Sequence, residues 1–252
     1  MRMDVRWLGR IPYREGWEHQ HALVEKRIAD TIPDQLLLLE HPPVFTLGRH
    51  ADESFVHAPA ELLAERGIEV IRVERGGEVT YHGPGQLVAY PIVRLAGRGL
   101  LIQPFVRLLE RAMIETCATY GVVAARREGM PGAWCDPDGP LPRKIGALGL
   151  RVEQGVSYHG IALNVTTDIA DFGLIDPCGM PGIGTASIAR EAGWPPDEQR
   201  PSTSSVEEAG RRFARIFGRL LEGDTRVAGL PADAAPADPA HVPVSGSPAP
   251  PG

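Results

Sequence analysis

The stretch KIGALGLRVEQGVSYHGIALNV, residues 144–165, decides how the middle of this chain must fold. Its two halves, KIGALGLRVE and VSYHGIALNV, are typical of β-strands. Both halves contain glycines, which leave few side chains to pack. A glycine inside a strand often marks a place where another group approaches the backbone closely. The stretch therefore predicts strands whose backbone is open to a neighbouring segment or a ligand.

Strands and helices alternate irregularly on both sides of this stretch. Further strands are expected at 35–40, 44–48, 68–73, 78–81 and 86–93, and in the segments VVAAR and GAWCD between 122 and 136. The HGPG turn at 82–85 is expected to join strands 78–81 and 86–93. Helices are expected at 13–29, 58–66, 102–120 and 205–221.

Two of these helices have a clear apolar side in the sequence. The first is expected to bury Trp17, His21, Val24 and Ile28. The last has capping-box spacing at Ser205 and Glu208, and its apolar positions are Val206, Ala209, Phe213, Phe217 and Leu220.

This order of elements predicts one α+β domain over residues 1–223, with a mixed or antiparallel sheet flanked by helices. The residues from 224 to 252 are rich in proline and alanine and have almost no large apolar side chain. Such a segment cannot bury enough surface to offset its ordering entropy, so a disordered tail is predicted there.

Composition excludes several classes of protein. The chain has 252 residues and a formal net charge of -6, which argues against a general nucleic-acid binder. No apolar run approaches the roughly 20 residues of a membrane span. The first residues lack an apolar signal-peptide core, so a cytoplasmic protein is expected. A local basic patch is still compatible with Arg126, Arg127, Arg143 and Lys144.

Three cysteines, at 117, 135 and 178, are too few and too widely spaced for a disulfide framework or a zinc site. Cys117 follows Met113 at helical spacing and is interpreted as a core residue. Cys135 lies near a turn and is interpreted as incidental. Cys178 lies between a proline and a glycine in IDPCGMPGIGTASI, outside any periodic pattern, and loops are where nucleophiles are usually displayed. It is the candidate nucleophile.

The segment RGGEVTYHGPGQ, residues 75–86, surrounds a histidine with four glycines but contains no nucleophile. It lacks the spacing of a phosphate-binding loop. Glycines here would let a ligand approach the main chain closely. His82 has three possible roles: orienting a neighbour, contacting the reacting group, or bracing the turn. The first and last are preferred.

RGGEVTYHGPGQ, RKIGALG, SYHGIALN and DPCG, in this order, resemble the lipoyl(octanoyl) transferases over roughly residues 28–222. The resemblance implies a fold similar to the catalytic domain of biotin and lipoate protein ligases. It implies transfer of an octanoyl group from acyl carrier protein to a specific lysine. The acceptors would be lipoyl domains of 2-oxoacid dehydrogenase complexes and the glycine cleavage H protein. No cofactor or metal is implied, and a monomer is expected.

The resemblance also assigns roles to residues. It makes Cys178 the acyl-thioester nucleophile and Lys144 the residue that lowers the pKa of its thiol. Three segments would bind substrate, namely Arg75, Gly76, Gly77, Glu78, Val79, Thr80, Tyr81 and His82, then Ala147, Leu148 and Gly149, then Gly160, Ile161 and Ala162. Three alternatives remain: an ATP-dependent lipoate protein ligase, an amidotransferase between lipoyl proteins, and a non-catalytic binder of lipoyl domains.

Overall fold

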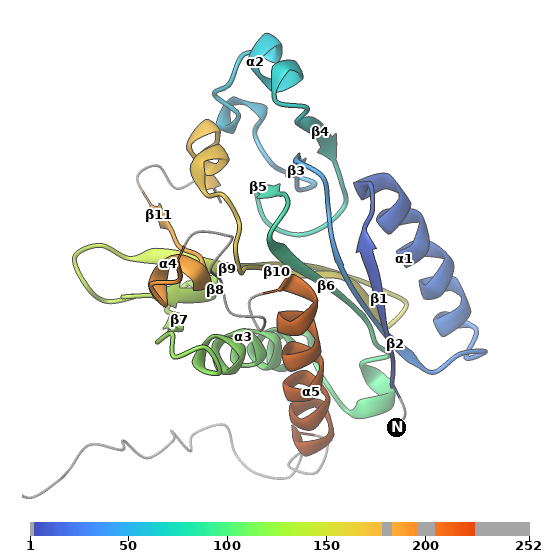
Figure 1. Cartoon of the computed structure of the whole chain (residues 1–252). Helices are drawn as coiled ribbons and strands as arrows, with labels where there is room; N and C mark the ends of the chain where they lie inside the picture. The colour runs from blue at the N-terminus through green and yellow to red at the C-terminus, as the bar shows by residue number, and fades with distance from the viewer. Residues whose placement is uncertain (1–2, 178–182, 196–204, 225–252) are drawn as a thin grey trace, which may run out of the picture.

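The computed structural model describes residues 3–177, 183–195 and 205–224, which form two β-sheets flanked by helices (Figure 1). The larger sheet has the order β1-β2-β6-β10-β9-β8-β7, with β11 added beside β9. Its strands are β1 (Met3–Arg10), β2 (Asp34–Glu40), β6 (Gln86–Ile92), β7 (Ala125–Arg127), β8 (Met130–Cys135), β9 (Arg143–Glu153), β10 (Val156–Asn164) and β11 (Gly184–Thr185). The smaller sheet has the order β4-β3-β5, from Glu69–Arg72, Val44–Leu47 and Val79–His82.

The larger sheet is mixed, because β1 runs parallel to β2 and β11 parallel to β9, while its other pairs are antiparallel. The α+β class with a mixed sheet is therefore confirmed. Strand β1 was not predicted from the sequence. Its polar sequence MDVRWLGR lies at the edge of the sheet and is only partly buried, so it lacks the apolar pattern of an interior strand.

The centre of the sheet is apolar on both faces, as the run QLLLLE predicted. Leu36 and Leu38 belong to the core under α3 (Ile102–Ala118) and α5 (Val206–Asp224). Leu37 and Leu39 belong to the core under α1 (Tyr13–Ile28) on the opposite face. Successive strand residues point to opposite faces, so β2 needs leucines throughout to fill both cores.

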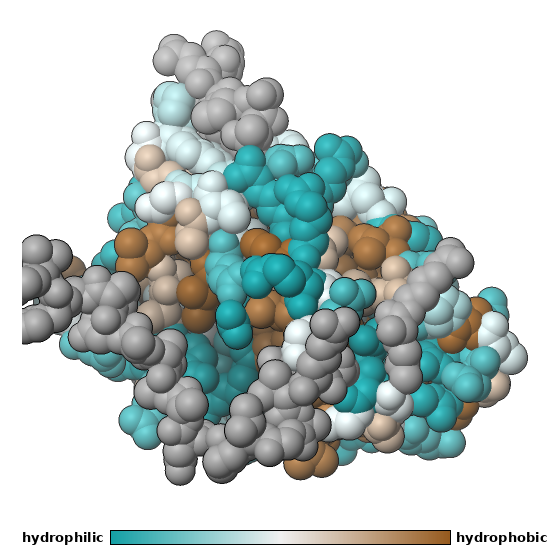
Figure 2. Space-filling model, turned by 90° about the horizontal axis from the view of Figure 1, so that it is seen from below, coloured by the Kyte–Doolittle hydropathy of each residue, from teal (hydrophilic) through white to brown (hydrophobic). Residues whose placement is uncertain are grey.

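Helix α5 matches its prediction closely. The Ser205 hydroxyl accepts a hydrogen bond from the Glu208 N–H at 3.1 Å, which begins the helix. The expected apolar side is buried against the sheet, at Val206, Ala209, Phe213, Phe217 and Leu220. Seen from below, where α3 and α5 lie, the molecule shows hydrophilic residues between smaller hydrophobic areas (Figure 2). Ion pairs such as that between Arg219 and Glu115 join the two helices there.

Helix α1 lies within one residue of the predicted bounds, but only part of its predicted buried side, at Val24, is buried. Gly16, Gln20, Val24 and Arg27 are buried, whereas Trp17 and His21 are only partly covered. Polar side chains can occupy the buried side because each has a partner there. The Gln20 Oε1 accepts from the His159 N–H at 2.7 Å, and Arg27 pairs with Asp34 at 2.8 Å. A pattern that counts only apolar residues cannot identify such a face.

The predicted strands at 78–81 and 86–93 exist, but they do not pair with each other. Strand β5 pairs with β3, while β6 pairs with β2 and β10. The turn at 82–85 therefore carries the chain from the smaller sheet to the larger one. Its glycines allow this crossing, since Gly85 has a φ of +83° and a Cβ there would lie 2.7 Å from the backbone of Thr166.

Short elements complete the domain. They are the α-helices α2 (Ala60–Glu65) and α4 (Ile188–Glu191) and the 3-10 helices at Glu53–Phe55, Ala96–Arg98 and Ala170–Leu174. The predicted tail, apart from Asp224 at the end of α5, lies outside the described residues.

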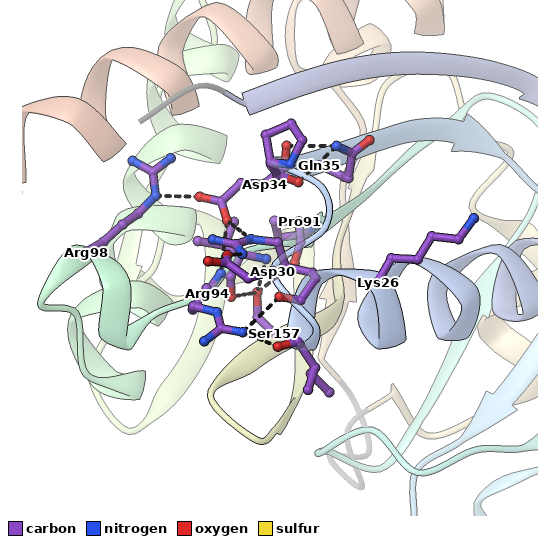
Figure 3. A network of polar contacts seen from close by, with 12 residues as sticks. Lys26, Asp30, Asp34, Gln35, Pro91, Arg94, Arg98 and Ser157 are labelled. Atoms are coloured by element: carbon purple, nitrogen blue, oxygen red, sulfur yellow. Dashed lines mark hydrogen bonds and ion pairs between the residues drawn. The ribbon is translucent and has the colours of Figure 1, made fainter.

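A buried carboxylate, that of Asp34, joins three segments through a network of polar contacts (Figure 3). Asp34, with 1% of its side chain exposed, accepts from Arg27 Nε at 2.8 Å and from Arg98 Nε at 2.6 Å. It also accepts from the Arg94 N–H at 3.1 Å. Arg94 in turn donates to the carbonyl groups that end α1. These contacts fix α1, β2 and the segment after β6 relative to one another.

Candidate active site

The glycine-rich segment after β4 forms one wall of a groove. Arg75 is buried and anchors this wall to β3, because its Nη2 donates to the Thr46 carbonyl at 2.6 Å and to the Thr46 hydroxyl at 2.8 Å. The Gly76 N–H donates to the Leu150 carbonyl at 3.1 Å and so ties the wall to β9. Gly77 lies so close to Gly48 that a Cβ on Gly48 would be 1.8 Å from the Gly77 oxygen. The glycines are needed for this close contact.

The groove lies between this wall and strands β9 and β10. Twelve of the fourteen substrate-binding residues expected from the sequence line it, namely Arg75, Gly77, Glu78, Val79, Thr80, His82, Ala147, Leu148, Gly149, Gly160, Ile161 and Ala162. Gly76 belongs to the wall but makes its contact with β9. The Tyr81 ring points into the core beside the smaller sheet, where it contacts Phe45 and Phe172.

A second cavity contains Lys144 and adjoins the groove, because Thr80, Ala147 and Ala162 line both. Its other lining residues include Pro177 and Ile183. Cys178 follows Pro177 in the sequence and lies outside the described residues. The structure thus brings Lys144 and the two ends of the Cys178 segment to one cavity at the end of the groove.

Lys144 is held by neighbouring strands. It pairs in register with Thr185 of β11 and with Trp134 of β8. The Ala186 N–H donates to the Lys144 carbonyl at 2.9 Å. These contacts place the residue at the start of β9, half-buried, as expected for the head of a strand.

A chain of buried hydrogen bonds leads from His82 to the segment beyond the second cavity. Gln86 Nε2 donates to the Tyr81 carbonyl at 3.1 Å and to Asn164 Oδ1 at 2.9 Å, so its Oε1 faces His82 Nδ1 at 2.7 Å. Asn164 Nδ2 then donates to the Ala186 carbonyl at 2.9 Å. An acceptor at Oε1 requires the proton on Nδ1 of His82.

Burial makes His82 a neutral residue. It lowers the pKa of His82 to about 3, with the neighbouring His41 acting in the same direction. His82 also stacks on the Tyr13 ring at 5.8 Å. This arrangement fits the preferred roles of bracing the turn and orienting a neighbour.

The far end of the groove contains residues that the sequence did not identify, namely Tyr13, Tyr90 and His159. The Tyr90 hydroxyl donates to His41 Nε2 at 2.8 Å, and His41 Nδ1 lies 2.8 Å from the Ile11 carbonyl. His159 is buried, with a φ of +54° within β10. These aromatic residues come from distant parts of the chain, so no local motif marks them. His159 alone had a signal, because it directly precedes Gly160 in SYHGIALN.

Cys117 and Cys135 are both buried. Burial raises the pKa of the Cys117 thiol well above its usual value and that of Cys135 to about 11. A thiol of this kind is a poor nucleophile, since the thiolate is the reactive form. Cys117 is a core residue, as predicted. Cys135 lies in the same core and is not exposed as its turn sequence suggested.

The described residues contain no group of three His, Cys, Asp or Glu placed to hold a metal ion. None of the described helices has the length and apolar character needed to cross a membrane.

This fold is similar to that of the lipoate and biotin protein ligases. A bipartite lipoate protein ligase from Thermoplasma acidophilum superimposes with a TM-score of 0.62 at 15% identity, covering 88% of this chain and 84% of that one. The biotin protein ligase from Aquifex aeolicus gives a TM-score of 0.54 at 10% identity, covering 89% and 72%. At these identities the likeness concerns the fold.

Sequence comparison is more specific. The model of the lipoyl protein ligase A/B catalytic domain matches residues 12–215, and the chain belongs to this family. It is 46% identical to an octanoyltransferase from Acidobacterium capsulatum, over 88% of this chain and 92% of the relative. It is 49% identical to one from Aromatoleum aromaticum, over 73% and 74%. The chain is an acyltransferase that transfers octanoyl groups in protein lipoylation, which confirms the family, fold and activity expected from the sequence.

Proposed function

We propose that the chain takes an octanoyl group from octanoyl-acyl carrier protein onto Cys178 and passes it to a lysine of a lipoyl domain. The acceptors would be 2-oxoacid dehydrogenase complexes and the glycine cleavage H protein. One observation carries the proposal. Lys144, the substrate groove and both ends of the segment that contains Cys178 meet at adjoining cavities.

The first step exchanges one thioester for another. The Cys178 thiolate attacks the octanoyl carbonyl carbon, a new C–S bond forms, and the C–S bond to the carrier's phosphopantetheine breaks. The departing thiolate takes up a proton. The Lys144 ammonium would favour the Cys178 thiolate through opposite charge. Because the activated bond is retained, this step needs no ATP.

The second step forms an amide. The neutral amine of the target lysine attacks the acyl carbon, and the bond to Cys178 breaks. With no thiolate beside it in the acyl-enzyme, Lys144 can give up its proton and then accept one from the attacking amine. The backbone N–H groups of Leu148, Gly149 and Gly179 are candidates to stabilise the oxyanion.

The groove suits the octanoyl chain. Small residues of β9 and β10, namely Ala147, Gly149, Gly160 and Ala162, line the groove. Each buried methylene would contribute about 0.8 kcal/mol to binding. We include in this proposal that the reaction takes place in the cytoplasm, since the nucleophile must remain a reduced thiol. We also include that a single chain carries it out.

The test is intact-protein mass spectrometry after incubation with octanoyl-acyl carrier protein in the absence of ATP. An octanoyl adduct should form on Cys178, be absent in Cys178→Ser and persist in Cys135→Ala, which removes a buried thiol instead. The adduct should disappear when a lipoyl domain is added, with octanoylation of one lysine.

Other outcomes identify the alternatives. Transfer that requires ATP and free octanoate would indicate a lipoate protein ligase. Transfer only from an octanoylated lipoyl protein, and not from octanoyl-acyl carrier protein, would indicate an amidotransferase. Binding of the lipoyl domain without transfer would leave only a binding function. An adduct that survives in Cys178→Ser would refute the nucleophile assigned here.

A further inference from the structure

Trp134 lies directly across from Lys144 on the neighbouring strand. The two residues are paired in register between β8 and β9. The Lys144 Nζ lies 5.1 Å from the centroid of the Trp134 ring. This is within the distance at which an aromatic face attracts an ammonium group. Trp134 is not among the described residues that line either cavity, so it contacts the lysine from behind the site.

The Trp134 ring is fixed in place. It is 0% exposed, and its Nε1–H donates to the Met130 carbonyl at 3.0 Å. A buried side chain of this size has little freedom to change rotamer. The ring therefore offers the lysine a rigid surface.

The stem of Lys144 is confined as well. A Cβ on Gly132 would lie 2.8 Å from Lys144 Cε and 2.4 Å from the Gly146 carbonyl oxygen. Gly132 also has a φ of +128°, which other residues rarely adopt. Its N–H donates to Glu110 of α3 at 3.0 Å. Gly132 therefore leaves space for the stem of Lys144, and the Trp134 ring lies beside its ammonium group.

A second cation shares the ring. The Arg127 Cζ of β7 lies 5.4 Å from the Trp134 centroid, and Arg127 Nη1 is buried without a hydrogen-bond partner in the structure. The Trp134 ring thus has two positively charged groups beside it, those of Lys144 and Arg127. Both cations lie within cation–π distance of the ring.

We propose that Trp134 is a positioning residue that holds the Lys144 ammonium in the orientation needed for acyl transfer. The inference rests on the proposed function, because it gives Trp134 a role through Lys144. Trp134 itself does not touch the substrate. Its loss should therefore lower kcat without changing the KM for octanoyl-acyl carrier protein, which is set by the groove.

The test compares Trp134→Phe with Trp134→Leu in steady-state transfer from octanoyl-acyl carrier protein to a lipoyl domain. Both variants remove volume and the Nε1–H hydrogen bond to Met130, but only Phe keeps an aromatic face. Trp134→Leu should lower kcat about tenfold, equivalent to about 1.4 kcal/mol, with KM within about twofold. Trp134→Phe should recover most of this loss. If Trp134→Leu does not fold, Trp134→Met takes its place, since Met fills irregular gaps.

Two results would overturn the proposal. One is an equal loss in Trp134→Phe and Trp134→Leu, which would mean that only the packing of Trp134 matters. The other is a kcat in Trp134→Leu within about twofold of the parent. Lys144→Met, measured alongside, separates a failure of the Trp134 proposal from a failure of the proposed function. If Lys144→Met keeps full kcat, the role of the lysine is wrong, whatever the Trp134 variants do.

Discussion

Asp34 offers a sharp test of what holds the domain together. Replacing it with asparagine keeps the shape of the side chain but removes its charge. Two guanidinium groups, of Arg27 and Arg98, would then remain buried without their carboxylate. The substitution lies at the end of the sheet away from the groove, so its effect should appear in stability rather than in binding.

The size of the effect follows from burial. The Asp34 side chain is 1% exposed, and those of Arg27 and Arg98 are 6% and 3% exposed. Breaking a buried pair by removing one partner typically destabilises a protein by about 3–5 kcal/mol, because the other charge stays buried and uncompensated. For a domain of this size, that corresponds to a fall in Tm of about 10 °C.

The assay is urea unfolding of the full chain, followed by circular dichroism, with Asp30→Asn as the matched control. Asp30 also pairs with Arg27, but its side chain is 73% exposed. An exposed pair contributes at most about 1 kcal/mol. Asp34→Asn should shift the unfolding midpoint by at least about 1 M at unchanged m-value, and Asp30→Asn should shift it much less. Equal shifts in the two variants would refute this account of the cluster.

Two more predictions concern the residues around the groove. His82 and His41 have pKa values lowered by burial to about 3 and about 4, below the value near 6.5 in an unfolded chain. Below pH 6.5 the unfolded state therefore binds more protons, and stability falls as the pH drops toward 4, by up to about 2 kcal/mol per histidine at pH 5. His82→Asn should lose less stability between pH 7 and pH 5 than the parent in urea unfolding, and an identical loss would contradict the assignment. In Gly160→Ala, a Cβ would lie 2.1 Å from the Ala89 carbonyl oxygen, so β6 and β10 must separate. Thermal unfolding should show a loss of more than about 2 kcal/mol, whereas Gly173→Ala, with open space around it, should change little, and a stable Gly160→Ala would contradict the close contact.

The sequence predicted elements well where local pattern and burial agree. QLLLLE was correct because a short, continuous apolar run is typical of a strand buried on both faces, and α5 was correct because an amphipathic helix has a distinct period. The buried side of α1 was missed because Gln20 and Arg27 are buried through polar partners on other strands. Strand β1 was missed because an edge strand needs little apolar surface.

The site residues could likewise be predicted only where a local pattern marks them. The three glycine-containing segments could be identified because close backbone approach requires glycine, which is visible in the sequence. Tyr13, His41 and Tyr90 could not, since they meet only after α1 has docked on the sheet. Trp134 also had no signal of its own, because its relation to Lys144 depends on the register between β8 and β9.

The crossing from β5 to β6 explains why one glycine-rich segment contributes both a wall of the groove and the hydrogen bonds around His82. Had these strands formed a hairpin, the turn would project from a single sheet and His82 would be exposed at its tip. Because the chain instead changes sheets at this turn, the residues before it become a wall facing β9 and β10. Gln86, just after it, hydrogen-bonds both His82 and Asn164. The groove is thus the space between two sheets at the point where the chain passes from one to the other, and Lys144 lies where that space reaches the Cys178 segment.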